Sequence, residues 1–221
     1  MRKATLLLNN ISLKSSQIHK FRGFIGRLFQ EHDLIHNHDP ETGRVIYRYP
    51  LIQFKLIRRT PAIIAVTDRA VKLFSEIFLK LDSIRIDDVR IPVFEKDLQV
   101  EDAEFGYTEE TFMYEFISSW IGLNQKNYGR YMKSSDTEER NRILKRALIG
   151  NLLSMSKYFD HWLDREQKIR AEIRVKERQV NLKGKSMIGF SGVFKANFLI
   201  PDHLGIGKSV SRGFGAVERV V

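Results

Sequence analysis

The stretch HLGIGKSVSRGFGAVER, residues 203–219, combines four glycines with cations and hydroxyl groups. These residues are Gly205, Gly207, Gly213, Gly215, Lys208, Arg212, Ser209 and Ser211. Glycine tolerates positive φ and has no Cβ to collide with a ligand, so this backbone can lie close to another backbone. N–H groups left bare beside cations form a cradle for an anion such as phosphate. The stretch therefore predicts a binding site for a nucleic-acid strand.

Two familiar motifs match this stretch only in part. GKS at 207–209 resembles the end of a nucleotide-triphosphate loop, but Asp202 stands where that motif requires glycine, and the following glycines do not favour a helix. RGFGAVER at 212–219 follows part of the RNA-recognition-motif signature, yet Ala216 and Arg219 stand where bases would stack on aromatic rings. Neither a triphosphate loop nor a base-stacking sheet surface is implied.

Composition favours a basic protein with a polyanionic partner. The 221 residues carry 37 Lys and Arg against 27 Asp and Glu, a formal net charge of +10. Neutralising phosphates releases counterions, which favours nucleic acid as the partner. The chain has no cysteine for disulfides or thiolate zinc sites, which suits a reducing cytosol and predicts a cytoplasmic location. No signal peptide or 18-residue apolar run appears, so we expect no membrane insertion.

Strand-like and helical patterns alternate over the first hundred residues. Short apolar runs predict strands, and apolar residues at helical spacing predict amphipathic helices. The predicted strands lie at 5–13, 45–57, 61–66 and 84–91, and the predicted helices begin near residue 17 and at Thr67. The order β-α-β-β-α-β is that of the ferredoxin-like unit.

The acidic segment 95–110 lacks a helical stripe and is interpreted as the crossing between two domains together with strand ends. The expected domains are 1–100, which carries the candidate catalytic histidines, and 101–221, which carries the glycine-rich stretch. An acidic crossing also leaves the basic residues for an RNA-binding face. An α+β fold of two tandem ferredoxin-like (RRM-like) domains with a C-terminal glycine-rich loop follows.

The second domain begins with a predicted strand at 111–120. Ser135 and Glu138 have the spacing of a capping box at the start of a helix. Residues 168–176 alternate apolar and basic side chains, and the KGK turn at 183–185 leads back into a second alternating strand, 192–200. In a second ferredoxin-like unit, a helix is then expected before the last strand. It is nearly lost here, and the glycine-rich stretch takes its place.

Four basic residues stand near the start of the long helix: Arg140, Arg142, Lys145 and Arg146. Positive charge there is unfavourable for the helix dipole, so these residues serve either a phosphate or a solvated basic face.

The pattern G-x-G-x-x-x-S-x-G-F-G-x-V at 205–217 resembles the C-terminal glycine-rich loop of the CRISPR-associated repeat-cleaving endoribonucleases of the RAMP superfamily. The resemblance covers the whole chain in outline and is close at its end. It implies an endoribonuclease that binds CRISPR repeat RNA and cleaves the precursor transcript within repeats, without metal or cofactor. The resemblance also implies attack by the 2′-OH, with 5′-hydroxyl and 2′,3′-cyclic phosphate ends as products. Members of that family also commonly lack the helix before the last strand.

The resemblance implies catalytic roles for His36 and His38. Histidine suits general acid and base chemistry because its ordinary pKa of about 6.5 lies near working pH. In the resembled family the active histidine follows the first helix, and one archaeal branch carries two with the spacing H-x-H. Spacing alone also allows incidental loop histidines or half of a metal site. The family's usual tyrosine on the first helix has no counterpart here.

The expected RNA contacts lie on the glycine-rich stretch, the first helix and the basic strand. They are Gly205, Gly207, Lys208, Ser211, Arg212, Gly213, Phe214, Gly215, Lys20, Arg170 and Arg174. Lys20, Lys55 or Arg44 could supply the cation that stabilises the transition state. A homodimer and a CRISPR effector complex are the further partners considered. A non-cleaving RNA-binding relative, acting as a guide-RNA carrier, and a subunit of another ribonucleoprotein are the alternatives.

Overall fold

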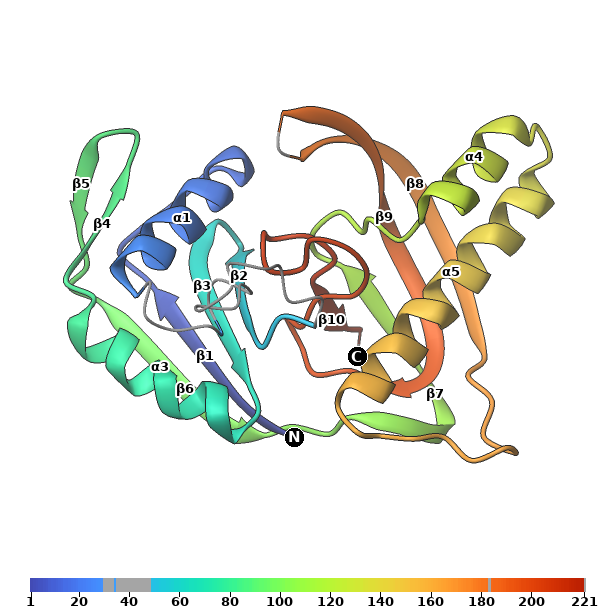
Figure 1. The fold of residues 1–221 in the computed structure, drawn as a ribbon, viewed down its shortest axis with the longest axis horizontal. Helices are drawn as coiled ribbons and strands as arrows, with labels where there is room; N and C mark the ends of the chain where they lie inside the picture. The colour runs from blue at the N-terminus through green and yellow to red at the C-terminus, as the bar shows by residue number, and fades with distance from the viewer. Residues whose placement is uncertain (30–33, 35–48, 183, 221) are drawn as a thin grey trace, which may run out of the picture. The chain divides into compact units, whose positions relative to one another are not determined.

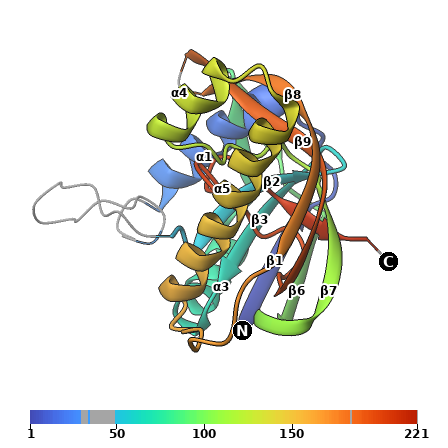
Figure 2. The ribbon, with the colours of Figure 1, turned by 90° about the vertical axis from the view of Figure 1, so that its right-hand side faces the viewer.

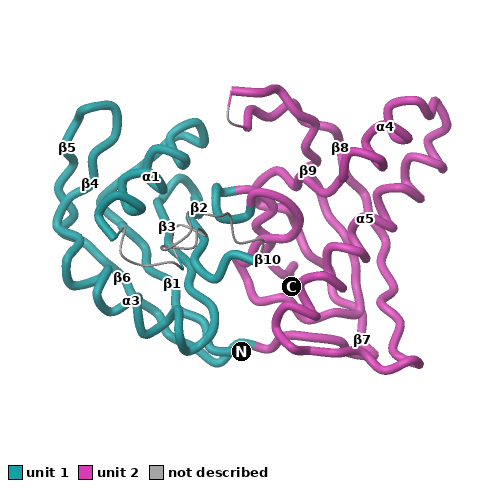
Figure 3. The backbone as a smooth tube through the Cα atoms, viewed as in Figure 1, with its two compact units in different colours: residues 1–103, 210–213 teal, residues 104–209, 214–221 magenta. Residues whose placement is uncertain are grey.

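The computed structural model describes residues 1–29, 34, 49–182 and 184–220. The chain divides into two compact units, each described by itself (Figure 3). Unit 1 comprises Met1–Ala103 and Val210–Gly213, and unit 2 comprises Glu104–Ser209 and Phe214–Val221. Four residues of the glycine-rich stretch thus belong to unit 1, a connection that the sequence patterns did not predict.

Unit 1 has ferredoxin-like topology (Figure 1). Its elements are β1 (Arg2–Leu8), the 3₁₀ turn η1 (Ser15–Gln17), α1 (Ile18–Leu28), β2 (Ile52–Ile57), β3 (Thr60–Val66), α3 (Asp68–Lys80), the hairpin β4 (Ser83–Ile86) and β5 (Val89–Pro92), and β6 (Lys96–Asp102). Among the described residues the sheet order is β2-β3-β1-β6, and every pairing is antiparallel. This is the strand order of a β-α-β-β-α-β unit.

Amphipathic helices cover this sheet as predicted. On α1 the residues Ile18, Phe21 and Ile25 recur at helical spacing and are buried. The ring of Phe21 meets that of Phe54 on β2 edge to face, with centroids 5.6 Å apart. Such a pair adds directional attraction to the burial of two large apolar side chains. The contact fixes α1 against β2, which is an edge strand of the sheet.

The fourth strand of the sheet was predicted wrongly. The run 84–91 forms the separate hairpin β4–β5, which turns at Asp87 and Asp88, both at positive φ. The acidic segment 95–110, interpreted as a domain crossing with strand ends, contains both β6 and the boundary between the units at Ala103 and Glu104. Its acids pair with bases of the neighbouring strand β1, Glu101 with Lys3 at 2.7 Å and Asp102 with Arg2 at 2.9 Å. Cross-strand pairing with a basic neighbour explains why an acidic sequence forms an edge strand here.

Unit 2 repeats the same topology. Its elements are β7 (Gly106–Phe116), α4 (Gln125–Lys133), α5 (Thr137–Tyr158), β8 (Ala171–Leu182), β9 (Lys185–Leu199) and β10 (Val217–Arg219), with sheet order β10-β7-β9-β8. Helices α4 and α5 lie on one face of this sheet (Figure 2). No helix occurs in residues 200–216, all of which are described, so the predicted loss of that helix is confirmed. The α+β fold of two ferredoxin-like domains is confirmed as well.

Stacked aromatic rings form the core of unit 2. Tyr114 stacks on Phe194 with centroids 5.3 Å apart, and Phe116 stacks on Trp120 at 5.4 Å. These rings are almost completely buried. The indole N–H of Trp120 donates to Asn151 of α5 at 3.1 Å, which satisfies its polar group inside the unit.

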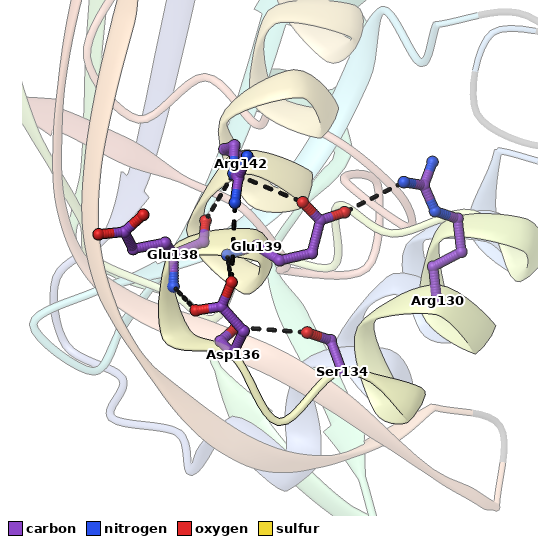
Figure 4. A network of polar contacts seen from close by, with 6 residues as sticks. All are labelled: Arg130, Ser134, Asp136, Glu138, Glu139 and Arg142. Atoms are coloured by element: carbon purple, nitrogen blue, oxygen red, sulfur yellow. Dashed lines mark hydrogen bonds and ion pairs between the residues drawn. The ribbon is translucent and has the colours of Figure 1, made fainter.

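The start of α5 differs from the prediction. Asp136 rather than Ser135 is the N-cap, because its carboxylate accepts from the backbone N–H groups of Glu138 at 2.9 Å and Glu139 at 3.3 Å. The same network contains Arg142, whose guanidinium lies 3.6 Å from Asp136 and 3.4 Å from Glu139 (Figure 4). Arg130 of α4, a helix that was not predicted, pairs with Glu139 at 3.1 Å.

Nearby carboxylates also account for Arg140, which lies 3.5 Å from Glu177. The carboxylates of the first turn and of β8 offset the charges of Arg140 and Arg142 beside the helix N-terminus. Of the two interpretations of this cluster, the structure favours a solvated basic face for these two residues. None of the helices in the described ranges has the length and apolar character to cross a membrane.

Candidate nucleic-acid interface

The glycine-rich stretch folds back on itself inside unit 2. Gly205 forms an isolated antiparallel bridge with Ala216. The N–H of Ile206 donates to the carbonyl of Gly215 at 2.8 Å, and that of Val217 to Leu204 at 3.2 Å. The two ends of the stretch therefore lie side by side and lead directly into β10.

Glycine is required at two positions because other atoms of unit 2 lie too close to leave room for a Cβ. A Cβ on Gly215, whose φ is 64°, would lie 2.0 Å from the carbonyl oxygen of Ile206. A Cβ on Gly207, whose φ is 89°, would lie 2.8 Å from both the Ile121 carbonyl oxygen and the Trp120 indole nitrogen. The predicted close approach is present. At these two positions the glycine backbone lies against other residues of the same protein.

The predicted cradle of bare N–H groups is wrong at several positions. Between residues 206 and 217, at least five N–H groups donate to acceptors within unit 2, at distances of 2.8 to 3.2 Å. They belong to Ile206, Lys208, Gly215, Ala216 and Val217, and their acceptors are Gly215 O, Ile121 O, Ser119 O, Ser118 Oγ and Leu204 O. Folded backbone tends to satisfy its own donors, so side chains of the stretch become the better candidates for contacting an anion. Lys208 is exposed and Arg212 is half-buried.

The middle of the stretch completes unit 1. Residue Arg212 forms a parallel bridge with Phe54, so the segment 210–213 runs along the free edge of β2. Gly213 has a φ of 94°, and a Cβ on it would lie 3.1 Å from the Ile18 side chain of α1. Ser211 between them is buried. The segment is thereby packed against both β2 and α1.

Lys55 fastens this segment from inside the unit. Its side chain is fully buried, and its Nζ donates to the carbonyl oxygen of Val210 at 2.8 Å. Burial lowers the pKa of Lys55 well below its ordinary value, because the charged form loses its hydration. Lys55 was considered as a cation for the transition state, and that role is wrong for a fully buried amine that binds the loop backbone.

Arg22 interacts with the stretch and is not among the residues predicted from the sequence. It lies one helical turn after Ile18 on α1 and is half-buried. Burial, and secondly the charge of Arg212, lower the pKa of Arg22. Only the tertiary contact of α1 with residues 210–213 brings these two guanidinium groups near each other. No local pattern in the sequence could have indicated it.

The remaining predicted residues are placed as follows. Lys20 forms an ion pair with Asp87 of the β4–β5 turn. Arg170 is exposed just before β8 and lies 3.8 Å from Glu109, and Arg174 is exposed on β8. Phe214 is half-buried in unit 2. His36, His38 and Arg44 lie outside the described residues.

In the described part of the chain, no group of three or more His, Cys, Asp or Glu residues is placed to hold a metal ion.

Two family models match the chain in succession. The model of the Cas6b N-terminal domain matches residues 2–104, and that of the Cas6b C-terminal domain matches residues 106–220. A protein of Methanocaldococcus jannaschii, given as uncharacterized protein MJ0978, is 42% identical over 146 residues, which are 66% of this chain and 97% of that protein.

Solved structures agree with these matches. A crystal structure of Cas6b is 36% identical, covers 99% of both chains and superposes with a TM-score of 0.93. A crystal structure of a CRISPR RNA processing endoribonuclease Cas6b is 33% identical over 100% of both chains, with a TM-score of 0.80. Csf5, a type IV Cas6 crRNA endonuclease, is 13% identical with a TM-score of 0.65, which shows a shared fold alone.

Proposed function

The chain belongs to the Cas6b family, whose two domain models match residues 2–104 and 106–220, and we propose that it is an endoribonuclease that processes CRISPR RNA. This membership confirms the resemblance inferred from the glycine-rich stretch. The observation that carries the proposal is the 33% identity, over the full length of both chains, to a CRISPR RNA processing endoribonuclease. The substrate is the repeat sequence of the precursor transcript.

The proposed chemistry is cleavage by the ribose 2′-OH. One of His36 and His38 takes the 2′-OH proton, and the 2′ oxygen attacks the adjacent phosphorus. The bond from phosphorus to the 5′ oxygen breaks, and the other histidine protonates that oxygen. The products are a 2′,3′-cyclic phosphate and a 5′-hydroxyl. Two imidazoles suffice for both proton transfers, so the proposal requires no metal.

Charge and exposure support RNA as the ligand. The formal net charge of +10 favours a polyanion. Three exposed positive side chains can neutralise phosphates. They are Lys208 on the glycine-rich stretch, Arg170 just before β8 and Arg174 on β8.

The deciding experiment incubates the purified protein with repeat RNA in the presence of a metal chelator. We expect cleavage to continue and the product ends to be a cyclic phosphate and a 5′-hydroxyl. A 2′-deoxy substitution at the cleaved nucleotide should abolish cleavage while binding remains, because it removes only the nucleophile. Cleavage that stops with the chelator would contradict metal independence.

The roles of the histidines are tested by the double variant H36A/H38A. We expect it to bind repeat RNA and to lose cleavage. The matched control is His19→Ala, since His19 is exposed on α1 and has no role in the proposed chemistry. A double variant that cleaves at the wild-type rate would move the site elsewhere. Wild-type protein that binds RNA and yields no product under any condition would favour the non-cleaving carrier.

Association with a second copy or with a CRISPR effector complex extends the same proposal. Light scattering with and without repeat RNA would reveal a dimer, and co-purification with the effector subunits would reveal the complex.

A further inference from the structure

Residues 210–213 and helix α1 form one packed region of unit 1. Gly213 lies against the side chain of Ile18, and Arg212 bridges to Phe54. Phe54 in turn holds Phe21 of α1 through their edge-to-face contact. One direct contact, and one path through Phe54, therefore fix the position of this segment relative to α1.

This packing brings two guanidinium groups close together. Arg22 follows Phe21 directly and lies one turn beyond Ile18, on the helix face that turns toward the segment. Arg212 occupies the middle of the segment. The two charges interact: burial and, secondly, the charge of Arg212 lower the pKa of Arg22. Like charges held together by a fold repel, and an anion that binds both replaces repulsion with attraction.

We propose that Arg22 and Arg212 together bind one phosphate group of the RNA backbone. This inference rests on the proposed function for the nature of the polyanion. It adds Arg22, a residue of the first helix, to the contacts expected from the glycine-rich stretch. A guanidinium group presents a planar set of N–H donors that matches phosphate oxygens, and two such groups can hold one phosphate from two directions.

The surrounding structure makes this pair suited to a fixed anion. The segment that carries Arg212 is held at Val210 by the buried Lys55 and at Gly213 by its contact with α1. Arg22 is half-buried, so its side chain loses little conformational freedom when a ligand binds. A partly desolvated pair also attracts an anion more strongly than two exposed lysines would.

The first test measures how RNA affinity depends on salt. On single-stranded nucleic acid, each neutralised phosphate contributes about 0.7 to the slope of log affinity against log salt. We expect the double variant R22Q/R212Q to lower this slope by about 0.7, the value for one shared phosphate. A decrease of about 1.4 would mean two separate phosphates, and no decrease would mean no phosphate contact. Either of these results overturns the proposal.

Single variants and a matched control complete this test. Arg22→Gln and Arg212→Gln should each weaken RNA binding roughly tenfold, as expected for one charge-assisted hydrogen bond lost. The matched control is Arg27→Gln, which removes the same charge from an exposed position of the same helix. It should change affinity much less. If Arg22→Gln does not fold, Arg22→Lys still tests the proposal. Lysine keeps the positive charge, so the salt slope should stay the same, but it lacks the planar set of donors, so RNA affinity should fall.

The second test uses inorganic phosphate in place of RNA. Phosphate should raise the melting temperature of the wild-type protein above that in chloride at equal ionic strength, and it should not do so for R22Q/R212Q. A protein that fails to cleave or bind repeat RNA but shows this difference would overturn the proposed function and leave the anion site standing. Equal effects of phosphate on the two proteins would overturn the anion site. Tighter binding of an acidic peptide than of RNA by the wild type would also overturn it.

Discussion

The Nζ of Lys55 donates a hydrogen bond of 2.8 Å to the carbonyl oxygen of Val210, a residue 155 positions further along the chain. A buried lysine thereby ties the glycine-rich stretch to the edge strand of the first sheet. Both partners are inside the protein, so water cannot replace either one.

Replacing Lys55 by Met should loosen residues 210–213 while the apolar part of the side chain is kept. The carbonyl of Val210 would lose its buried donor, at a cost of about 1–3 kcal/mol. Amide hydrogen exchange should quicken at residues 210–213, and RNA affinity should fall. Lys72→Met on the exposed side of α3 is the control and should alter neither quantity. Unchanged exchange at these amides in K55M would contradict the fastening role.

Lys55 should also make the stability of the protein depend on alkaline pH. Burial lowers its pKa in the folded protein, whereas the unfolded chain has the ordinary lysine value of about 10.4. Between these two pKa values the unfolded state binds more protons, so the free energy of unfolding rises with pH, by at most about 1.36 kcal/mol per pH unit. Urea denaturation at several pH values should show this rise in the wild type relative to K55M. A constant difference between the two proteins up to pH 10.4 would refute it.

Gly215→Ala should strongly destabilise unit 2. The new Cβ would lie 2.0 Å from the carbonyl oxygen of Ile206, at a φ of 64° that alanine disfavours. We expect a loss of several kcal/mol or a failure to fold, measured by thermal denaturation. Gly129→Ala on α4 is the matched control, because nothing lies within 4 Å of its Cβ position. That change should stabilise the helix by up to about 1 kcal/mol.

Asp136→Ala should destabilise α5 by about 0.5–2 kcal/mol, the usual cost of losing an N-cap. The variant loses the bonds to the N–H groups of Glu138 and Glu139 and the ion pair with Arg142. Ser135→Ala, the residue that the sequence pattern favoured as the cap, should have almost no effect. Chemical denaturation of the two variants distinguishes these assignments, and equal losses would mean that both residues cap the helix.

The elements that sequence predicted best are those with strong periodicity. The apolar residues of α1 recur every three or four positions, and the alternation before the KGK turn predicted the β8–β9 hairpin. Helix α4 was missed because it buries only Tyr131 among its nine residues, so it has no apolar stripe. Strand β6 was missed because its acids conceal the alternation, and their partners on β1 lie about a hundred residues away.

The candidate site was predictable in kind but not in arrangement. The glycines of residues 203–219 correctly indicated a backbone that closely approaches another stretch of backbone. Which stretch that is depends on contacts with Ile121, Ser119 and Lys55, far away in sequence. The proximity of Arg22 and Arg212 arises in the same way, from tertiary packing that leaves no local signature.

The membership of residues 210–213 in unit 1 also bears on how the protein is made. The ribosome completes Met1–Ala103 long before it reaches these four residues, so unit 1 stays incomplete until residues 210–213 have been made. Until then the outer edge of β2 is open, and the amine of Lys55 has not yet met the Val210 carbonyl. An open strand edge is a template for pairing with other chains. The nascent protein therefore passes through a period of aggregation risk that ends when residues 210–213 bind the edge of β2.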